Sequence, residues 1–286
     1  MRPIVIGIGE FLWDMLPDGK KAGGAPVNFA YHASQNGAEG WAVSAVGDDS
    51  LGQELKQTAT EHGINMLVET VSHPTGTVKV ELKNGQPNFI ITDNVAWDYI
   101  PMTENALDKA RHAAAISFGT LAQRSPVSRE TTRSLIAAAP SDALIVYDIN
   151  LRQHFYSKEL IDSSLRMANI FKVNDEELEV LKPMFDIKNE STEQACRFFL
   201  REYGLHMLVL TGGDRFSSIY TPDDSSTIDT PKVALVDAVG AGDSFSGALV
   251  GNLLSGAPIR DAHKAAVETA AYVCTQSGAW TPAKEK

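Results

Sequence analysis

A glycine-broken turn near the carboxyl end of the chain contains residue types suited to chemistry on a phosphate. Gly240, Ala241 and Gly242 lead directly into Asp243, and an apolar helical stripe continues through residues 244–254. The first amides of a helix and the positive end of its dipole form a seat for an anion, and small residues let a phosphate approach the backbone. A carboxylate beside that seat can accept a proton from an attacking hydroxyl. The combination fits phosphoryl transfer.

The same residues also have a purely structural interpretation. The glycines around Ala241 could simply form a turn, and Asp243 could simply cap the helix that follows. Short glycine motifs recur by chance, so this segment alone does not separate the two interpretations. A second motif elsewhere in the chain is therefore the deciding observation.

Two distant segments together resemble the signatures of one protein family. The sequence DAVGAGDSFSGAL, which starts at Asp237, is similar to the C-terminal signature DTxGAGDxFxGAL of the PfkB (ribokinase-like) carbohydrate kinases. AGGAPVNFAYHASQNG at 22–37, followed by VGDDSLG at 46–52, resembles the N-terminal motif of the same family. The two signatures occur in the family's order and span nearly the whole chain, with Ala238 standing where the family commonly has threonine.

The resemblance implies both a fold and a reaction. The fold is an α/β ribokinase-like three-layer sandwich with a mainly parallel central sheet and a small β lid, formed as a single kinase domain over residues 1–286. The reaction is transfer of a phosphoryl group from ATP, with Mg²⁺, to a sugar hydroxyl. Asp243 is then the catalytic base, and the amides of Gly240, Ala241 and Gly242 form the anion seat.

Candidate sugar contacts lie before and within the first signature and in a second loop. Asp14, Gly24 and Asn28 resemble the sugar contacts of the family, since carboxylate and amide groups bond vicinal hydroxyls and glycine lets a sugar lie against backbone. The run DINLR, which supplies Asn150 and Arg152, is similar to the DPNLR run of fructokinase-like members. Each of three residues alone has an ordinary structural alternative. Asp14 could be a solvated acid in a turn, Asn28 a polar residue in the first turn of a helix, and Arg152 a surface arginine.

Candidate nucleotide and metal residues follow two predicted strands. NDEE, from Asn174 to Glu177, matches the family motif NxxE, whose oxygens can order water around Mg²⁺. The alternative is an N-capping asparagine followed by acidic residues in the first helical turn, and both roles can hold at once. Thr211 and Gly213 resemble the nucleotide-binding TxGxxG loop, in which Phe216 stands at the final glycine.

Two further sets of residues are assigned through the resemblance alone. Residues 270–278, ending at Gly278, occupy the place where family members form the wall of the adenine pocket. Asp237 and Val239 match positions that in relatives help to bind a monovalent cation, such as K⁺, next to the anion seat.

The composition limits the class of partner. The net charge of −11 at pH 7 argues against nucleic-acid binding, which requires clustered lysine and arginine. We expect no membrane partner, because no apolar run is long enough to span a bilayer. The chain starts with a strand pattern instead of a signal peptide, so we expect a cytoplasmic protein. Cys196 and Cys274 have no CxxC or zinc spacing and are expected to be reduced thiols. The partner that the resemblance implies is a small-molecule sugar.

Alternating strand and helix patterns are expected to position these residues. Apolar runs predict buried strands at 3–9, 41–46, 114–118, 144–148, 170–173 and 207–210, and edge strands near 216–222 and 228. Strands separated by helical sequence indicate a mainly parallel sheet covered on both faces. Ligands of such sheets bind at the carboxyl ends of the strands, where the candidate polar residues collect.

The remaining β pattern predicts the lid. Residues 76–91 alternate polar and apolar side chains around a turn at Asn84 and Gly85, which indicates a hairpin. A turn at 17–19 indicates that the strand after residue 10 also folds back. We expect these segments, at about 10–20 and 75–100, to form a discontinuous β lid. A homodimer through this lid and a monomer both fit the pattern.

These observations predict an ATP-dependent kinase that phosphorylates a sugar primary hydroxyl. DINLR favours fructose through its resemblance to fructokinases, while ribose, a nucleoside or 2-keto-3-deoxygluconate are alternative acceptors. A sugar-binding sensor without catalysis is an alternative of another class, against which the intact Asp243 argues. A dinucleotide oxidoreductase is a third alternative, but GIG at 7–9 lacks the third glycine of that fingerprint.

Overall fold

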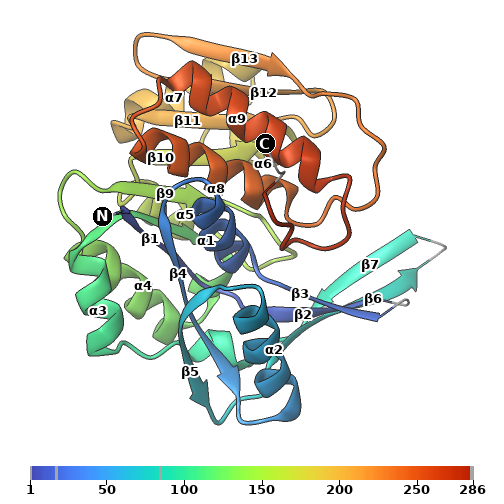
Figure 1. Cartoon of the computed structure of the whole chain (residues 1–286). Coiled ribbons are helices and arrows are strands. Elements are labelled where there is room, and N and C mark those ends of the chain that lie inside the picture. Colours follow the sequence, from blue (N-terminus) through green and yellow to red (C-terminus); the bar gives the residue numbers. More distant parts are fainter. Residues whose placement is uncertain (1, 17–18, 84–85, 284–286) are drawn as a thin grey trace.

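The fold is built around one large β-sheet with a smaller sheet beside it (Figure 1). The computed structural model describes residues 2–16, 19–83 and 86–283. In these residues the large sheet has nine strands in the order β13-β12-β11-β10-β9-β8-β1-β4-β5. These strands are β1 (Ile4–Ile8), β4 (Glu39–Gly47), β5 (Asn65–Val71), β8 (Ala113–Gly119), β9 (Leu144–Asp148), β10 (Ile170–Asn174), β11 (Met207–Thr211), β12 (Phe216–Tyr220) and β13 (Ser225–Asp229).

Most strand pairs of the large sheet are parallel, as the alternating pattern predicts. The exceptions are β12, which pairs antiparallel with β11, and β13, which pairs antiparallel with β12. Of these two strands, β13 lies at the edge and β12 lies inside the sheet, so the expectation of an edge position for β12 was wrong. The opposite edge is β5, which the sequence analysis did not identify because Glu69 and other polar residues interrupt its apolar pattern.

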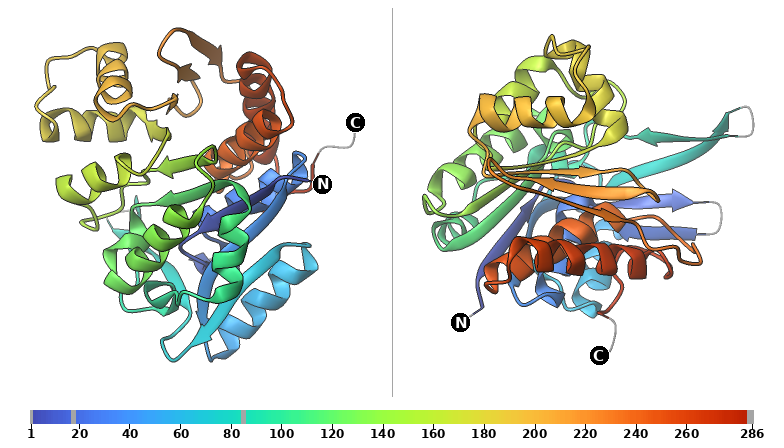
Figure 2. Two further views of the ribbon diagram at one scale, coloured as in Figure 1. Left: turned by 90° about the vertical axis from the view of Figure 1, so that its left-hand side faces the viewer. Right: turned by 90° about the horizontal axis from the view of Figure 1, so that it is seen from above.

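Helices cover both faces of the large sheet, which confirms the three-layer arrangement (Figure 2). One face carries helices packed around Val5 and Val209, and the other carries helices packed around Ile6 and Leu208, because neighbouring residues of a strand point to opposite faces. The first group is α1 (Ala25–Gln35), α2 (Ser50–Glu61), α8 (Ala241–Leu254) and α9 (Ile259–Val273). The second group is α3 (Glu104–Arg111), α4 (Pro126–Ala138), α5 (Lys158–Leu165), α6 (Asp175–Met184) and α7 (Thr192–Tyr203).

The smaller sheet is assembled from two segments far apart in sequence. Its order is β3-β2-β6-β7, and the β6–β7 ribbon projects beyond the body of the molecule (Figures 1 and 2). Its strands are β2 (Leu12–Leu16), β3 (Gly19–Gly23), β6 (Gly76–Lys83) and β7 (Gln86–Ile91). The predicted turns at Pro17 and at Asn84–Gly85 include positions outside the described residues.

The predicted bounds of the smaller sheet need two corrections. Its first segment continues beyond residue 20, because β3 extends to Gly23. Its second segment ends at Ile91, and residues 92–100 belong to the main body. There, Ala96–Tyr99 forms a 3₁₀ turn, and Trp97 is fully buried in the main hydrophobic core. Core burial of this large aromatic side chain explains why the segment leaves the sheet.

A row of aromatic side chains anchors helix α7 to the sheet. Phe171 lies between Tyr147 and Phe199, with ring centroids 5.8 Å and 5.6 Å apart, and all three side chains are fully buried. Such contacts add to the free energy of burying the aromatic surface.

We expect Phe171→Ala to lower the free energy of unfolding by about 3–5 kcal/mol, because it removes a buried ring and leaves a cavity. Urea denaturation measures this change. The matched control is Val180→Ala on the exposed surface of α6, where we expect a change within about 0.5 kcal/mol. A Phe171→Ala protein as stable as this control would contradict the expectation.

Candidate active site

The N-terminus of α8 brings the two signature motifs into contact. Asn28 of α1 donates from Nδ2 to the Oδ2 atom of Asp243, at 2.8 Å. The Oδ1 atom of Asn28 accepts a hydrogen bond from the indole nitrogen of Trp280, also at 2.8 Å. Since an indole N–H can only donate, it fixes the orientation of the Asn28 amide and directs its N–H group toward Asp243. A buried chain of hydrogen bonds therefore orients the candidate base.

The surroundings of Asp243 make its carboxylate a weaker acid than usual. Burial and, next, repulsion from Asp148 raise the pKa of Asp243 to about 6. Lys172, the Asn28 hydrogen bond and Arg152 act in the opposite direction. A carboxylate of this pKa is mostly ionised at neutral pH and still accepts a proton more readily than a solvated aspartate.

The turn before Asp243 has the backbone geometry of an anion seat. Gly240 adopts φ +76°, in the left-handed region that favours glycine. The Ser244 amide closes the first helical turn onto the Gly240 carbonyl at 2.8 Å, so the amides that precede Ser244 belong to the unpaired N-terminus of the helix. The Ala241 amide makes only a long contact, 3.3 Å, with the Ala238 carbonyl.

A buried lysine that the sequence analysis missed lies beneath this seat. Lys172 Nζ donates to Asp148 Oδ2 at 2.6 Å, and it would be 3.3 Å from a Cβ atom placed on Gly242. Burial lowers the pKa of Lys172, but attraction to Asp148 and Asp243 outweighs it, so the net pKa is raised and the ammonium stays charged. The available signal was a lysine inside the apolar strand β10, close to its carboxyl end.

A second missed residue is Glu10, which follows β1 at the same edge of the sheet. Its side chain is buried, and among the described residues its Oε2 atom has no hydrogen-bond partner. Burial, followed by repulsion from Asp243 and Asp148, raises the pKa of Glu10 to about 7. Glu10 and Asn150 line a cavity of about 10 Å³, which is comparable to the space that one water molecule needs.

The predicted sugar contacts surround this centre. Asp14 is half-buried in β2, and burial, with repulsion from Asp237, raises its pKa to about 6. Gly24 precedes α1 with φ +125°, and a Cβ atom there would lie 2.1 Å from the Glu10 carbonyl oxygen. Only glycine fits such a close approach. Asn28 is used mainly to hold Asp243, which leaves one of its N–H groups for a ligand.

The DINLR loop after β9 supplies the other two predicted residues. Asn150 adopts φ +42°, and its Oδ1 atom accepts a hydrogen bond from Arg152 at 3.2 Å. Arg152 is exposed, but its charge lowers the pKa values of Asp14, Glu10 and Asp243. Its guanidinium therefore lies near enough to act on the charges of the candidate site.

A cavity of about 410 Å³ opens beside the anion seat and has the size of a ligand pocket. Ala241 and Gly242 belong to its lining, as do Thr211 and Gly213. Apolar side chains make up much of the rest: Val233 and Leu235 from the segment between β13 and α8, and Val267, Ala270, Ala271 and Cys274 from α9 and its C-cap. This lining fits a flat apolar base at one end and phosphates at the other.

Two positions assigned from the resemblance to the nucleotide-binding segments of the family differ in their surroundings. Phe216, which replaces the last glycine of the TxGxxG loop, begins β12 and packs against Gly212, where a Cβ atom would lie 2.6 Å from its ring. Phe216 thus lines the cavity. Gly278 is not among the lining residues, and its amide donates to Asp237 at 3.1 Å.

The predicted metal residue Glu177 forms a helix cap together with Asn174. Each side chain accepts from the other's backbone amide, and Glu177 Oε1 also accepts from the Leu151 amide at 2.9 Å. This confirms the capping role that the sequence allowed. The remaining lone pairs of the carboxylate fit a Mg²⁺ ion held through water, which is the usual arrangement for Mg²⁺ on a nucleotide.

Asp237 connects three elements at the base of the anion seat. It accepts from the amides of Val239 and Gly278 and from the ammonium group of Lys21 in β3, at 3.0 Å, 3.1 Å and 2.8 Å. Burial alone would raise the pKa of Asp237, but these donors hold it below its ordinary value.

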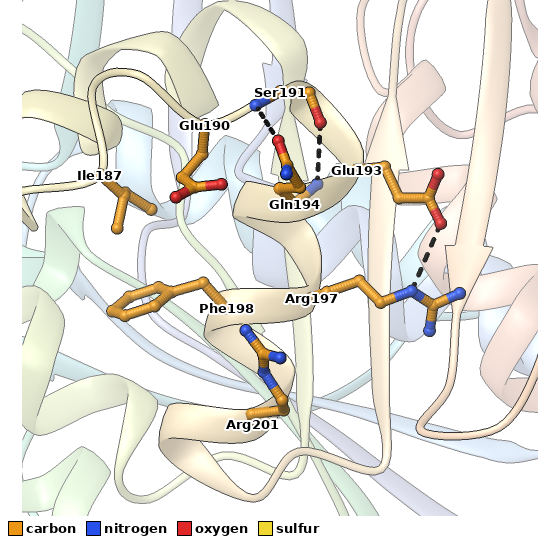
Figure 3. Close-up of a pocket in the computed structure, with 8 residues that line it drawn as sticks. All are labelled: Ile187, Glu190, Ser191, Glu193, Gln194, Arg197, Phe198 and Arg201. Atoms are coloured by element: carbon orange, nitrogen blue, oxygen red, sulfur yellow. Dashed lines mark hydrogen bonds and ion pairs between the residues drawn. The ribbon is translucent and has the colours of Figure 1, made fainter.

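A separate pocket at the start of α7 contains none of the predicted site residues (Figure 3). Ser191 and Gln194 form a reciprocal helix cap there, and Glu193 pairs with Arg197 on the same helix. The contacts drawn in this pocket are thus accounted for by the helix and its cap. Among the described residues, no helix has the length and apolar content needed to cross a bilayer.

Comparisons with known proteins agree with this geometry. Fructokinase-2 of Solanum lycopersicum is 28% identical over 306 residues, which cover 99% of this chain and 91% of that protein. The crystal structure of an uncharacterized sugar kinase of Pyrococcus horikoshii matches with a TM-score of 0.81 and 27% identity, over 97% of this chain and 93% of the other. The same P. horikoshii protein has also been solved in complex with ATP.

A Vibrio cholerae fructokinase shares the fold at 23% identity, with a TM-score of 0.82 over 99% of this chain and 95% of the other. That structure contains fructose, ADP and a potassium ion. The model of the pfkB family carbohydrate kinases matches residues 18–286, which include the anion seat, the base and most of the sugar-side residues. The chain therefore belongs to the pfkB family of carbohydrate kinases.

Proposed function

We propose that the protein transfers the γ-phosphoryl group of ATP to a primary hydroxyl of a sugar, with fructose as the acceptor. The observation that carries the proposal is the position of Asp243: its carboxylate is oriented by Asn28 and lies beside the unpaired amides that open α8. Similarity to fructokinases along nearly the whole chain supports fructose.

Asp243 is the general base in this proposal. Its carboxylate removes the proton of the sugar hydroxyl, the hydroxyl oxygen forms a bond to the γ-phosphorus, and the bond to the bridging oxygen breaks as ADP leaves with the electron pair. The raised pKa of Asp243 suits a proton acceptor that works near neutral pH. The proton then sits on Asp243 until water removes it.

The moving phosphoryl group needs compensation of its negative charge. The amides of Gly240, Ala241 and Gly242 supply fixed dipoles, and the buried ammonium group of Lys172 supplies a full charge behind Gly242. Mg²⁺, held through water near Asn174 and Glu177, would shield the charges of the nucleotide phosphates. The apolar cavity lined by Ala270 and other residues of α9 fits the adenine base.

The smaller sheet acts as a lid over the sugar in this proposal. Asp14 of β2 and Arg152 bind hydroxyl groups, Asn150 and Gly24 shape the pocket, and Glu10 adds a buried carboxyl group at its floor. Closing the lid would exclude water, which competes with the sugar as the phosphoryl acceptor. A homodimer through this sheet stays a prediction that sedimentation would test.

The acceptor is tested with a panel of fructose, ribose, nucleosides and 2-keto-3-deoxygluconate, each with MgATP and scored by ADP release. We expect the highest kcat/KM for fructose. A higher kcat/KM for another acceptor would overturn the assignment of fructose as the acceptor and leave the kinase assignment intact. Sugar binding by calorimetry without phosphorylated product would instead support a sensor.

We expect Asp243→Asn to lower kcat by about 10²- to 10⁴-fold while sugar binding persists, because a positioned base contributes a rate factor of this size. Steady-state kinetics and calorimetry with fructose measure the two quantities. Asp261→Asn, an exposed acid in the first turn of α9, is the matched control and should keep normal turnover. Near-normal turnover of Asp243→Asn would remove Asp243 from the mechanism.

The raised pKa of Asp243 predicts the acid limb of the pH profile. The carboxylate is ionised and active above about pH 6, so kcat/KM should fall as the pH drops through that value. The midpoint belongs jointly to Asp243 and Glu10, because these two carboxyl groups repel each other. A profile that stays flat down to about pH 4.5, measured with a pH-independent assay of ADP, would contradict a base of raised pKa.

We expect Trp280→Phe to lower kcat by about 3- to 10-fold, because the loss of one hydrogen bond leaves the Asn28 amide free to rotate and turn its oxygen toward Asp243. The control is Trp41→Phe, which removes an indole donor that bonds only Glu39, away from the site. An unchanged kcat in Trp280→Phe would show that Trp280 does not orient Asn28.

A further inference from the structure

Lys21 occupies an unusual position between the lid and the anion seat. It belongs to β3, where it is paired in register with Asp14 of β2. Its Nζ atom lies 2.8 Å from Asp237 Oδ2, although the two residues are far apart in sequence. Lys21 belongs to the smaller sheet, and Asp237 belongs to the segment before α8. Both side chains are largely buried, with 24% and 12% of their surfaces exposed.

Lys21 therefore faces two carboxylates. Repulsion from Asp237 helps to raise the pKa of Asp14, and Lys21 acts to lower it, so all three groups are close enough to interact. The Lys21 ammonium also holds the pKa of Asp237 below its ordinary value despite burial. The lysine thus neutralises negative charge between the sugar side and the phosphate side of the site.

Asp237 is one of the two residues expected to bind a monovalent cation, and this structure allows a test of that expectation. Its Oδ2 atom already accepts from Lys21 and Gly278, and its Oδ1 atom accepts from the Val239 amide. A second cation on the same carboxylate, at about 4 Å from the ammonium, would bind about 10³-fold more weakly because of charge repulsion. The residues present therefore do not fit a free K⁺ ion at Asp237.

We propose that the Lys21 ammonium group replaces the monovalent cation, so that this kinase needs no K⁺. The inference rests on the proposed kinase function. An ammonium group has the same charge as K⁺ and a similar size, and its attachment to β3 gives it a high effective concentration at Asp237. Neutralising Asp237 keeps the turn that leads into Gly240 attractive to phosphate.

The test uses the full chain with fructose and MgATP in either KCl or tetramethylammonium chloride at the same ionic strength. We expect equal rates in the two salts for the unmodified protein. Lys21→Met should lose about 10- to 10³-fold in rate in tetramethylammonium chloride and recover on addition of KCl. Lys21→Arg, which keeps the charge, should remain independent of K⁺.

Lys20→Met is the matched control. Lys20 is the neighbouring residue of the same strand, and it pairs with Glu54 instead of Asp237. This variant removes one positive charge from β3 and should keep both its rate and its independence of K⁺. The same rate loss in Lys20→Met and Lys21→Met, with no rescue by KCl, would overturn the inference.

Thermal unfolding gives a readout that does not depend on catalysis. KCl should raise the melting temperature of Lys21→Met more than tetramethylammonium chloride does, with no such difference in the unmodified protein. A rate or melting temperature of the unmodified protein that depends specifically on K⁺ would overturn the inference. Absence of phosphorylated product in every salt and with every acceptor would overturn the kinase function, and the melting temperatures would still decide whether Lys21 replaces K⁺.

Discussion

The close approach of α1 and α8 is the constraint on which the candidate site depends. A Cβ atom at Gly247 would lie 2.7 Å from the Phe29 carbonyl oxygen, and one at Gly251 would lie 2.6 Å from the Asn36 carbonyl oxygen. Glycines one helical turn apart on α8 therefore let its backbone pack directly against α1. Only this packing joins Asn28 to Asp243, two residues separated by 215 positions.

The site also depends on an imbalance of buried charge. Asp243, Asp148 and Glu10 are grouped at the carboxyl ends of the central strands, and Lys172 is the buried cation that opposes them. Burial and electrostatic repulsion raise the pKa values of Asp243 and Glu10, which is costly for folding but useful for proton transfer. The Asp148–Lys172 pair reduces this cost, because the ammonium group lies 2.6 Å from Asp148 Oδ2 and compensates the charge of that carboxylate.

Local sequence patterns predicted those features that form within a single helix, strand or turn. The anion seat follows from glycines at a helix start, and the Asn174–Glu177 cap follows from residue types at fixed spacing. The mainly parallel sheet followed from alternating strand and helix patterns. These features require no knowledge of which elements lie side by side.

The residues that the sequence analysis missed depend on contacts between distant elements. Lys172 matters because Gly242 packs over it, and Trp280 matters because its indole reaches Asn28. In the sequence, Glu10 is an ordinary polar residue that follows a strand. Only the folded arrangement brings it close to Asp148 and Asp243. The end of the smaller sheet could not be predicted for the same reason. Residues after Ile91 leave that sheet because Trp97 packs into the main hydrophobic core, which is formed by distant elements.

Contacts on either side of Lys21 link the two halves of the site mechanically as well as electrostatically. Asp14 and Lys21 share a strand pair, so movement of one moves the other. Asp237, the partner of Lys21, is joined through the Val239 amide to the turn that ends at Gly240. In the proposed mechanism, a sugar bound at Asp14 would therefore lie one strand pair and one ion pair away from the turn that receives the phosphoryl group. The Lys21–Asp237 ion pair would then couple sugar binding to that turn, since a charge change at either place alters the electrostatic field at the other.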